Sequence, residues 1–119
     1  MKIRVLLLPT GYAVLCEIAR SRVELERGLM DRSSLLPCFG MFFIHPREGV
    51  YRYWMKGVLI PLDLVWLDSD MRVTEIVTNA VPGSVELLGG AMPSRFVLEI
   101  PAGQVARYRL APGQVLEFV

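Results

Sequence analysis

Histidine and cysteine, the residues that most often build metal sites and nucleophilic centres, are scarce in this sequence. It has one histidine, His45, and two cysteines, Cys16 and Cys38. A zinc site needs several such ligands at short spacings, and a serine-type triad needs a nucleophile-elbow motif, which the chain lacks. The methionines, soft ligands that suit copper(I), are spread along the chain, and glycine-rich phosphate motifs are missing. The sequence therefore predicts no metal and no cofactor.

An excess of charge of either sign is also absent. The chain has 13 basic and 12 acidic residues, for a formal net charge of +1. The densest basic stretch, residues 20–32, also contains Glu24, Glu26 and Asp31. Nucleic acids and anionic membrane surfaces are bound by clustered basic patches. We therefore expect neither as a partner.

No apolar run is long enough to cross a bilayer. The longest, residues 58–67, is interrupted by Pro61 and Asp63, whereas a spanning helix needs ~20 apolar residues. Residues 1–8 have the basic and then apolar order of a signal peptide, but the apolar core is short and no small-residue cleavage site follows. We therefore expect a cytoplasmic protein.

The length and the apolar content of 53% fit one domain spanning residues 1–119. A chain of this size buries roughly two thirds of its unfolded surface, enough for a core without metal or disulfide staples. Short apolar segments separated by glycine and proline predict an α+β, mainly β domain, with an antiparallel or mixed sheet in a barrel-like or roll arrangement. The first two strands should form a hairpin. The expected strands are residues 2–8, 12–18, 41–44, 51–56, 62–67, 72–78, 96–100 and 114–119.

Two helices are expected. Ser21 followed by Glu24 has the spacing of a capping box, which predicts a capped helix near residues 21–31. A shorter helix is expected near residues 103–108, after the Pro101-Ala102-Gly103 turn. The glycine- and proline-rich residues 80–93 should form a long irregular connection, which in a small domain is often functional.

Single residues in the remaining segments have simple interpretations. His45 precedes a proline in an expected polar turn, residues 45–50, and is interpreted as a solvated loop residue. Cys16 falls in an apolar strand pattern and should be a small buried hydrophobe. Cys38 follows a proline in an expected loop and should be the more exposed thiol, although no neighbouring base marks it as a nucleophile.

Several motifs occur together in an order that resembles the domain of unknown function 192 family, over about residues 10–119. The most specific is the segment from Tyr53 to Asp63, an aromatic-Trp-Met-Lys run followed by Ile-Pro-Leu-Asp. The resemblance implies a small, mainly β domain of bacteria and archaea, with no established catalytic residues. The other motifs are Gly28-Leu29-Met30 with Arg32, Gly40-Met41-Phe42-Phe43, Arg95-Phe96-Val97-Leu98-Glu99, Pro101-Ala102-Gly103, and Leu110 with Gly113.

The chain departs from the family pattern at two places. Gly57-Val58 follow Trp-Met-Lys where the family usually has Asn-Thr, and Leu25 replaces an arginine that commonly follows the helix glutamate. Polar groups that could bind a ligand in relatives are therefore changed here.

Asp63 is the most conspicuous charged residue, because it lies between Leu62 and Leu64 in the most hydrophobic segment. A buried carboxylate is costly unless it is paired or hydrogen-bonded. Asp63 should therefore either accept backbone N–H bonds at the Pro61 bend or act as a site carboxylate. Lys56 and Arg32 are its candidate partners.

The predicted ligand-binding residues are Arg32, Trp54, Met55, Lys56 and Asp63. Trp54 and Met55 lie on opposite faces of the expected strand, where core packing or an aromatic cleft wall would explain them. We expect a non-catalytic domain that binds a small ligand or a peptide in a cleft near residues 54–63.

Two alternatives remain open at this stage. One is a structural or partner-recruiting accessory domain, whose motif is simply a folding core. The other is an enzyme centred on Asp63, with Lys56 and Arg32 as charge stabilisers. The protein should be a monomer or a weak dimer formed through an edge strand.

Overall fold

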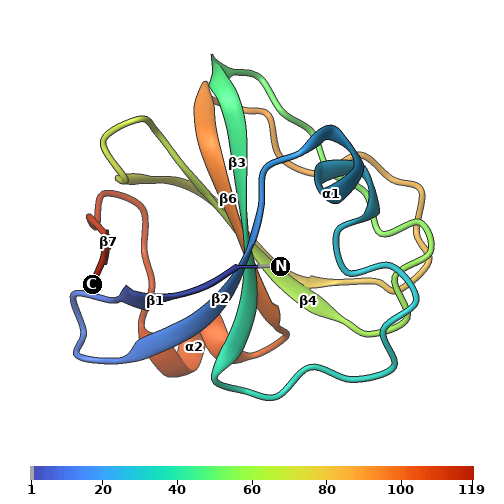
Figure 1. The fold of residues 1–119 in the computed structure, drawn as a ribbon, viewed down its shortest axis with the longest axis horizontal. Helices are drawn as coiled ribbons and strands as arrows, with labels where there is room; N and C mark the ends of the chain where they lie inside the picture. Colours follow the sequence, from blue (N-terminus) through green and yellow to red (C-terminus); the bar gives the residue numbers. More distant parts are fainter. Residues whose placement is uncertain (1) are drawn as a thin grey trace.

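A computed structural model describes residues 2–119 as a curled seven-stranded sheet with two short helices (Figure 1). This confirms the expected α+β, mainly β fold. None of the described helices has the length and hydropathy needed to cross a membrane. In chain order the elements are β1 (Ile3–Leu7), β2 (Ala13–Ala19), α1 (Arg22–Arg27), β3 (Phe39–Gly49), β4 (Leu62–Leu67), β5 (Val73–Ala80), β6 (Ser94–Pro101), α2 (Gln104–Tyr108) and β7 (Glu117–Phe118).

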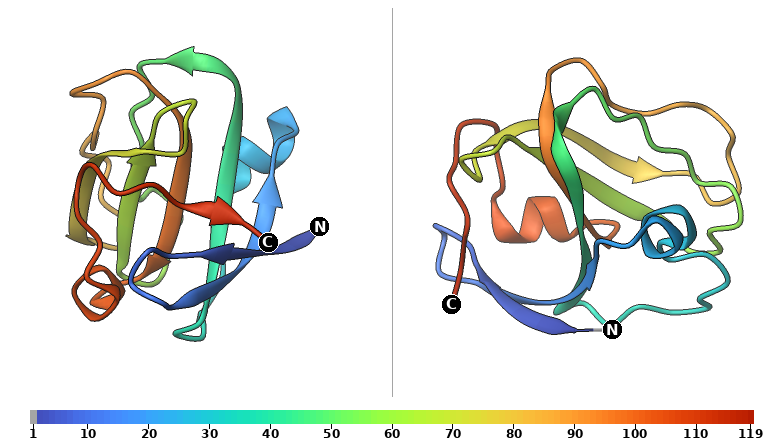
Figure 2. Two further views of the ribbon diagram at one scale, coloured as in Figure 1. Left: turned by 90° about the vertical axis from the view of Figure 1, so that its left-hand side faces the viewer. Right: turned by 45° about the horizontal axis from the view of Figure 1, so that its top comes forward.

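The sheet is mixed, with the strand order β5-β4-β6-β3-β2-β1-β7. Only β2 and β3 pair in parallel, because the chain crosses through α1 between them, and every other pair is antiparallel. The sheet curls until its two edges approach each other (Figure 2). They meet at the bridge between Arg72 and Val115 and the bond from Val73 N–H to the Gln114 carbonyl (2.8 Å). The sheet is barrel-like but does not close into a barrel.

Two strand assignments from the sequence are wrong. The expected strand 41–44 and the polar turn 45–50 form one strand, β3, which runs from Phe39 to Gly49. Pro46 is tolerated there because the ladder with β6 is irregular between Ile44 and Gly49, so that its missing N–H removes no regular bond.

The expected strand 51–56 is instead an extended segment with one isolated bridge, from Tyr53 to Leu88. Its pairing partner lies in residues 81–93, which are irregular as predicted. Tyr53 and Leu88 exchange two backbone bonds, of 2.9 and 2.7 Å, and Met55 adds one bond each with Ser84 and Gly83, both of 3.0 Å, so the two segments are joined without a regular ladder. Both segments lie on the same side of the sheet as α1 (Figure 2).

The two faces of the sheet bury different side chains, because successive residues of a strand point in opposite directions. In β4, Leu62, Leu64 and Trp66 join a core on the α1 side, whereas Val65 and Leu67 join a core on the α2 side. The two helices lie on opposite sides of the band formed by β3 and β6 (Figure 1). A charged residue inside a strand therefore points to the α1 side or to the α2 side of the sheet.

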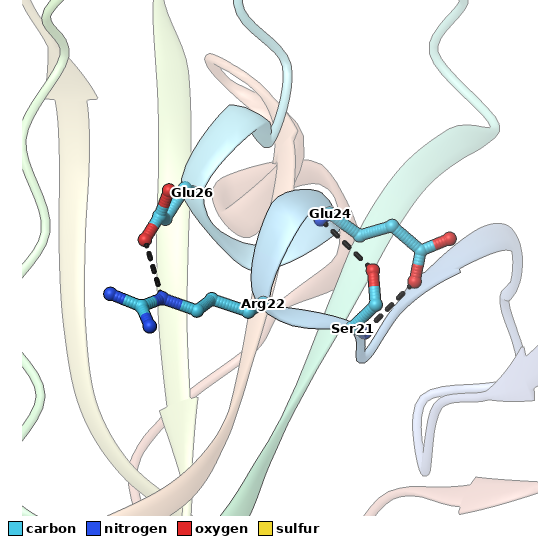
Figure 3. A network of polar contacts seen from close by, with 4 residues as sticks. All are labelled: Ser21, Arg22, Glu24 and Glu26. Atoms are coloured by element: carbon cyan, nitrogen blue, oxygen red, sulfur yellow. Dashed lines mark hydrogen bonds and ion pairs between the residues drawn. The ribbon is translucent and has the colours of Figure 1, made fainter.

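The capping box at α1 is confirmed (Figure 3). The Glu24 N–H donates to Ser21 Oγ (3.1 Å), and the Ser21 N–H donates to Glu24 Oε1 (3.0 Å). Arg22 and Glu26 form an exposed ion pair one turn apart (3.2 Å). The helix ends at Arg27, earlier than expected, because Gly28 has a φ of 49°, which stops the helical path.

Replacing Ser21 with alanine should lower the free energy of unfolding by about 1 kcal/mol, because one N–H of the first turn loses its acceptor. Urea denaturation monitored by circular dichroism measures this change. Ser33→Ala is the matched control, since Ser33 is exposed and lies outside any element. Equal stability of the two variants would contradict a stabilising role for the cap.

Candidate functional site

Asp63 is fully buried and faces the α2 side of the sheet. Its Oδ2 accepts the N–H groups of Gly103 and Val105, both at 3.0 Å, at the start of α2. Its Oδ1 accepts the N–H of Asn79 in β5 (2.9 Å). The carboxylate thus accepts backbone bonds, but it joins β5 to α2 and is not confined to the Pro61 bend.

Arg32 pairs with a residue other than Asp63. Its guanidinium forms a two-pronged hydrogen bond with Glu17 of β2, in which Nη2 lies 2.8 Å from Oε1 and Nη1 donates to Oε2. Glu17 raises the pKa of Arg32 through this bond. Arg32 therefore ties the chain after α1 to β2.

The Trp54-Met55-Lys56 run divides between surface and core. Met55 is fully buried in the α1-side core, whereas Trp54 is 44% exposed. Core packing therefore explains Met55 but not Trp54. The Lys56 Nζ lies 5.4 Å from the centre of the Trp54 ring, within the range of a cation–π contact.

A cavity of about 460 Å³, here called the α1 cavity, lies beside α1. Its volume falls within the usual range for small-molecule sites. Trp54 and Lys56 line it, but Arg32, Met55 and Asp63 do not. The other lining residues are Leu25, Glu26, Arg27, Gly28, Leu29, Met30, Phe43, His45, Arg52, Tyr53, Val58 and Glu99.

Glu99 of β6 brings a buried carboxyl group to the α1 cavity. The residue is only 4% exposed, and its carboxyl makes no hydrogen bond or ion pair with residues 2–119. Burial raises the pKa of Glu99 to about 8. Near neutral pH the group is therefore mostly a neutral acid, which can both donate and accept a hydrogen bond.

Tyr53 and His45 form a hydrogen-bonded pair in the same cavity. The His45 Nε2 and Tyr53 Oη atoms are 2.7 Å apart, and the His45 ring stacks on Tyr51 with 3.7 Å between centroids. Burial lowers the pKa of His45 to about 4, so the imidazole is neutral at physiological pH. Burial, and then the nearby Glu99, raise the pKa of Tyr53. The solvated loop position expected for His45 is thus wrong, because β3 continues through it and buries it.

A second cavity of about 680 Å³, here called the arginine hollow, adjoins the first. The two share Leu25, Glu26 and His45. The arginine hollow is otherwise lined by Arg20, Arg22, Ile44, Pro46, Tyr51 and Arg95.

The two cysteines lie in different environments. Cys16 is buried, which raises the pKa of its thiol to about 12, and Cys38 is exposed, as expected for both. In the part of the chain that the structure describes, no three His, Cys, Asp or Glu side chains lie close enough together to hold a metal ion.

The sequence did contain a signal for Glu99. It lies between Leu98 and Ile100, the same apolar-acid-apolar pattern that drew attention to Asp63. No pattern pointed to Tyr53 and His45 as a pair, because they come from different segments and meet only when residues 51–56 fold over β3. Leu25 and Val58, two positions at which the chain departs from the family pattern, also line the α1 cavity.

The fold and the site define a small β domain with an open, curled sheet. A cavity lies between the sheet and a short helix, and the carboxyl group of Glu99 lines it. The chain belongs to the family DUF192, described as an uncharacterized ACR, whose pattern matches residues 5–118. This family has no established activity. No curated protein sequence matches the chain.

Two crystal structures share the fold over nearly the whole chain. A Sinorhizobium meliloti 1021 protein, provisionally described as a transcription regulator, has a TM-score of 0.92 and 35% identity, covering 99% of this chain and 94% of that one. A protein of unknown function from Novosphingobium aromaticivorans DSM 12444 has a TM-score of 0.89 and 34% identity, covering 97% and 83% of the two chains.

Proposed function

We propose that this domain binds a small organic molecule in the α1 cavity, with the Glu99 carboxyl as its main polar partner. The supporting observation is that Glu99 is buried, lines a cavity and lacks a hydrogen-bond partner within the described residues. Among residues 2–119 the fully enclosed side-chain atoms without a partner are Ser94 Oγ and Gln104 Oε1, so the Glu99 carboxyl is open to the cavity. A polar group that opens into a mostly apolar cavity and has no protein partner is available to bind a ligand there.

The other walls suit a ligand with an apolar body. Leu25, Phe43 and Val58 line the cavity, and the exposed ring of Trp54 lies at its edge beside Lys56. Small-molecule sites typically combine mostly apolar walls with a few directed polar groups. The Tyr53–His45 pair would be the second such group in this site.

This proposal moves the centre of the predicted cleft. Trp54 and Lys56 remain candidate ligand contacts. Met55 and Asp63 would not touch the ligand, and their role would be to stabilise the fold. Arg32 would position the segment that follows α1. A cytoplasmic location belongs to the same proposal, since both cysteines are unpaired, as is usual where thiols are kept reduced.

A thermal-shift screen with a panel of small metabolites tests the proposal. At a concentration about 100 times its Kd, a true ligand should raise the melting temperature by roughly 10 °C. Glu99→Leu should fold, because it replaces an unpartnered buried carboxyl by an apolar group, and it should weaken binding about tenfold or more.

Glu86→Leu is the matched control, since Glu86 is exposed in the 81–93 segment. It should bind as the wild type does. Ligands that bind equally well to the Glu99→Leu variant would contradict the proposal. A screen without any ligand would favour the structural or partner-recruiting alternative.

A further inference from the structure

The arginine hollow places three guanidinium groups beside the α1 cavity. Arg20 precedes α1, Arg22 lies in its first turn, and Arg95 comes from β6. These residues are up to 75 positions apart in the chain (95 − 20), and only the fold brings them to one hollow.

Much of their hydrogen-bonding capacity is unused. Arg22 pairs with Glu26, but both side chains are largely exposed, so this pair is weak. Arg95 uses its Nε to donate to the His45 carbonyl (3.2 Å), and its two terminal nitrogens have no hydrogen-bond or ion-pair partner among residues 2–119. Among residues 2–119, no acceptor binds the Arg20 guanidinium.

The charges around the hollow are therefore unbalanced. Glu26 is the only acidic residue in its lining, against three arginines. His45, which also lines the hollow, is neutral because burial lowers its pKa to about 4. Arg52 and Lys56 add positive charge at the adjoining α1 cavity.

We infer that the ligand is an amphipathic organic anion, whose charged group binds in the arginine hollow and whose apolar body enters the α1 cavity past His45. This inference rests on the proposed function and names the chemical class of its ligand. Arginine favours carboxylate and phosphate groups because its planar fork donates two parallel hydrogen bonds.

The floor of the α1 cavity is compatible with such a ligand. Burial raises the pKa of Glu99 to about 8, so near neutral pH the acid is mostly uncharged and would not repel an anion. A nucleic acid fits less well, because the free guanidiniums line a hollow with apolar walls, including Ile44 and Leu25, and not an extended basic face.

A series of probes with one chain length and three charges tests the inference: octanoate, 1-octanol and octylamine, titrated calorimetrically at pH 7 and low salt. Octanoate should bind at least about tenfold more tightly than octanol, as expected for one charge-assisted hydrogen bond. Octylamine should bind most weakly.

Arg20→Gln and Arg95→Gln should each remove about tenfold of the octanoate affinity and leave octanol binding unchanged. Arg107→Gln is the control. It removes the same charge from an exposed residue of α2, on the other side of the sheet, and should have no effect.

Equal affinity for octanoate and octanol, or tighter binding of octylamine, would overturn the anion inference and leave cavity binding intact. Loss of octanoate affinity in Arg107→Gln as large as in Arg20→Gln would also overturn it, since the effect would then be general charge. A short DNA duplex that binds more tightly than octanoate and is released by Arg20→Gln would assign the arginines to nucleic acid instead. The inference would be rejected if none of the three probes binds and the metabolite screen finds only uncharged or cationic ligands. If the screen finds no ligand at all, the proposed function itself would be rejected.

Discussion

Replacing Asp63 with asparagine should lower the free energy of unfolding by about 3 kcal/mol, because an amide NH₂ would face backbone N–H donors in a fully buried site. Asp63 is fully buried and accepts three N–H groups, from Asn79, Gly103 and Val105. An asparagine has a single acceptor oxygen, so at least one of these donors loses its partner. Urea denaturation measures the loss.

Asp70→Asn is the control for this prediction, since Asp70 is exposed in the turn between β4 and β5. Its stability should stay within about 0.5 kcal/mol of the wild type. An Asp63→Asn variant as stable as the Asp70→Asn variant would show that the carboxylate is not needed for folding. A functional role for Asp63, such as the acid or base of an enzyme, would then be the better explanation of its burial.

Replacing Glu99 with glutamine should remove a pH dependence of stability. The pKa of Glu99 rises from its ordinary value of 4.5 to about 8 in the fold, so between these values the native state holds a proton that the unfolded state has released. The wild-type free energy of unfolding should therefore fall as pH rises through this range, by up to about 1.4 kcal/mol per unit. The glutamine variant should not show this fall.

The clearest window lies above pH 6.5. The pKa of His45 is lowered from 6.5 to about 4, so its contribution has the opposite sign and increases stability as pH rises between these values. From pH 6.5 to 8 the wild type should lose about 2 kcal/mol relative to Glu99→Gln. Urea titrations at both pH values measure the difference, with Glu86→Gln as an exposed control. Parallel curves for wild type and Glu99→Gln would contradict a protonated Glu99.

Where the sequence predicted the fold well, the decisive interactions are local. The hairpin of β1 and β2, the capping box at Ser21 and the short helix Gln104–Tyr108 each depend on residues a few positions apart. The buried strand Leu62–Leu67 was recognisable because apolar residues fill both of its faces, and it is paired on both sides.

Where the sequence misled, distant pairing overrode local signals. Pro46 and the polar residues near it suggested a turn, but pairing with β6 carries β3 through to Gly49. Residues 51–56 had the composition of a strand, yet their partner segment 81–93 is too irregular to offer a ladder. Gly89, in that segment, is required for packing: a Cβ there would lie 2.1 Å from the Trp66 ring.

Asp63 and Glu99 show which properties of a residue follow from the sequence and which depend on the tertiary structure. The patterns Leu62-Asp63-Leu64 and Leu98-Glu99-Ile100 are locally equivalent, and each requires that a carboxyl group be buried inside a strand. That requirement follows from residue chemistry and needs no fold. Which face of the sheet each carboxyl occupies depends on strand register: Asp63 faces α2 and finds three N–H donors, whereas Glu99 faces the α1 cavity and finds none. The arginine hollow has the same origin. Arg20, Arg22 and Arg95 are scattered in a nearly neutral chain, and only the fold brings them to one hollow.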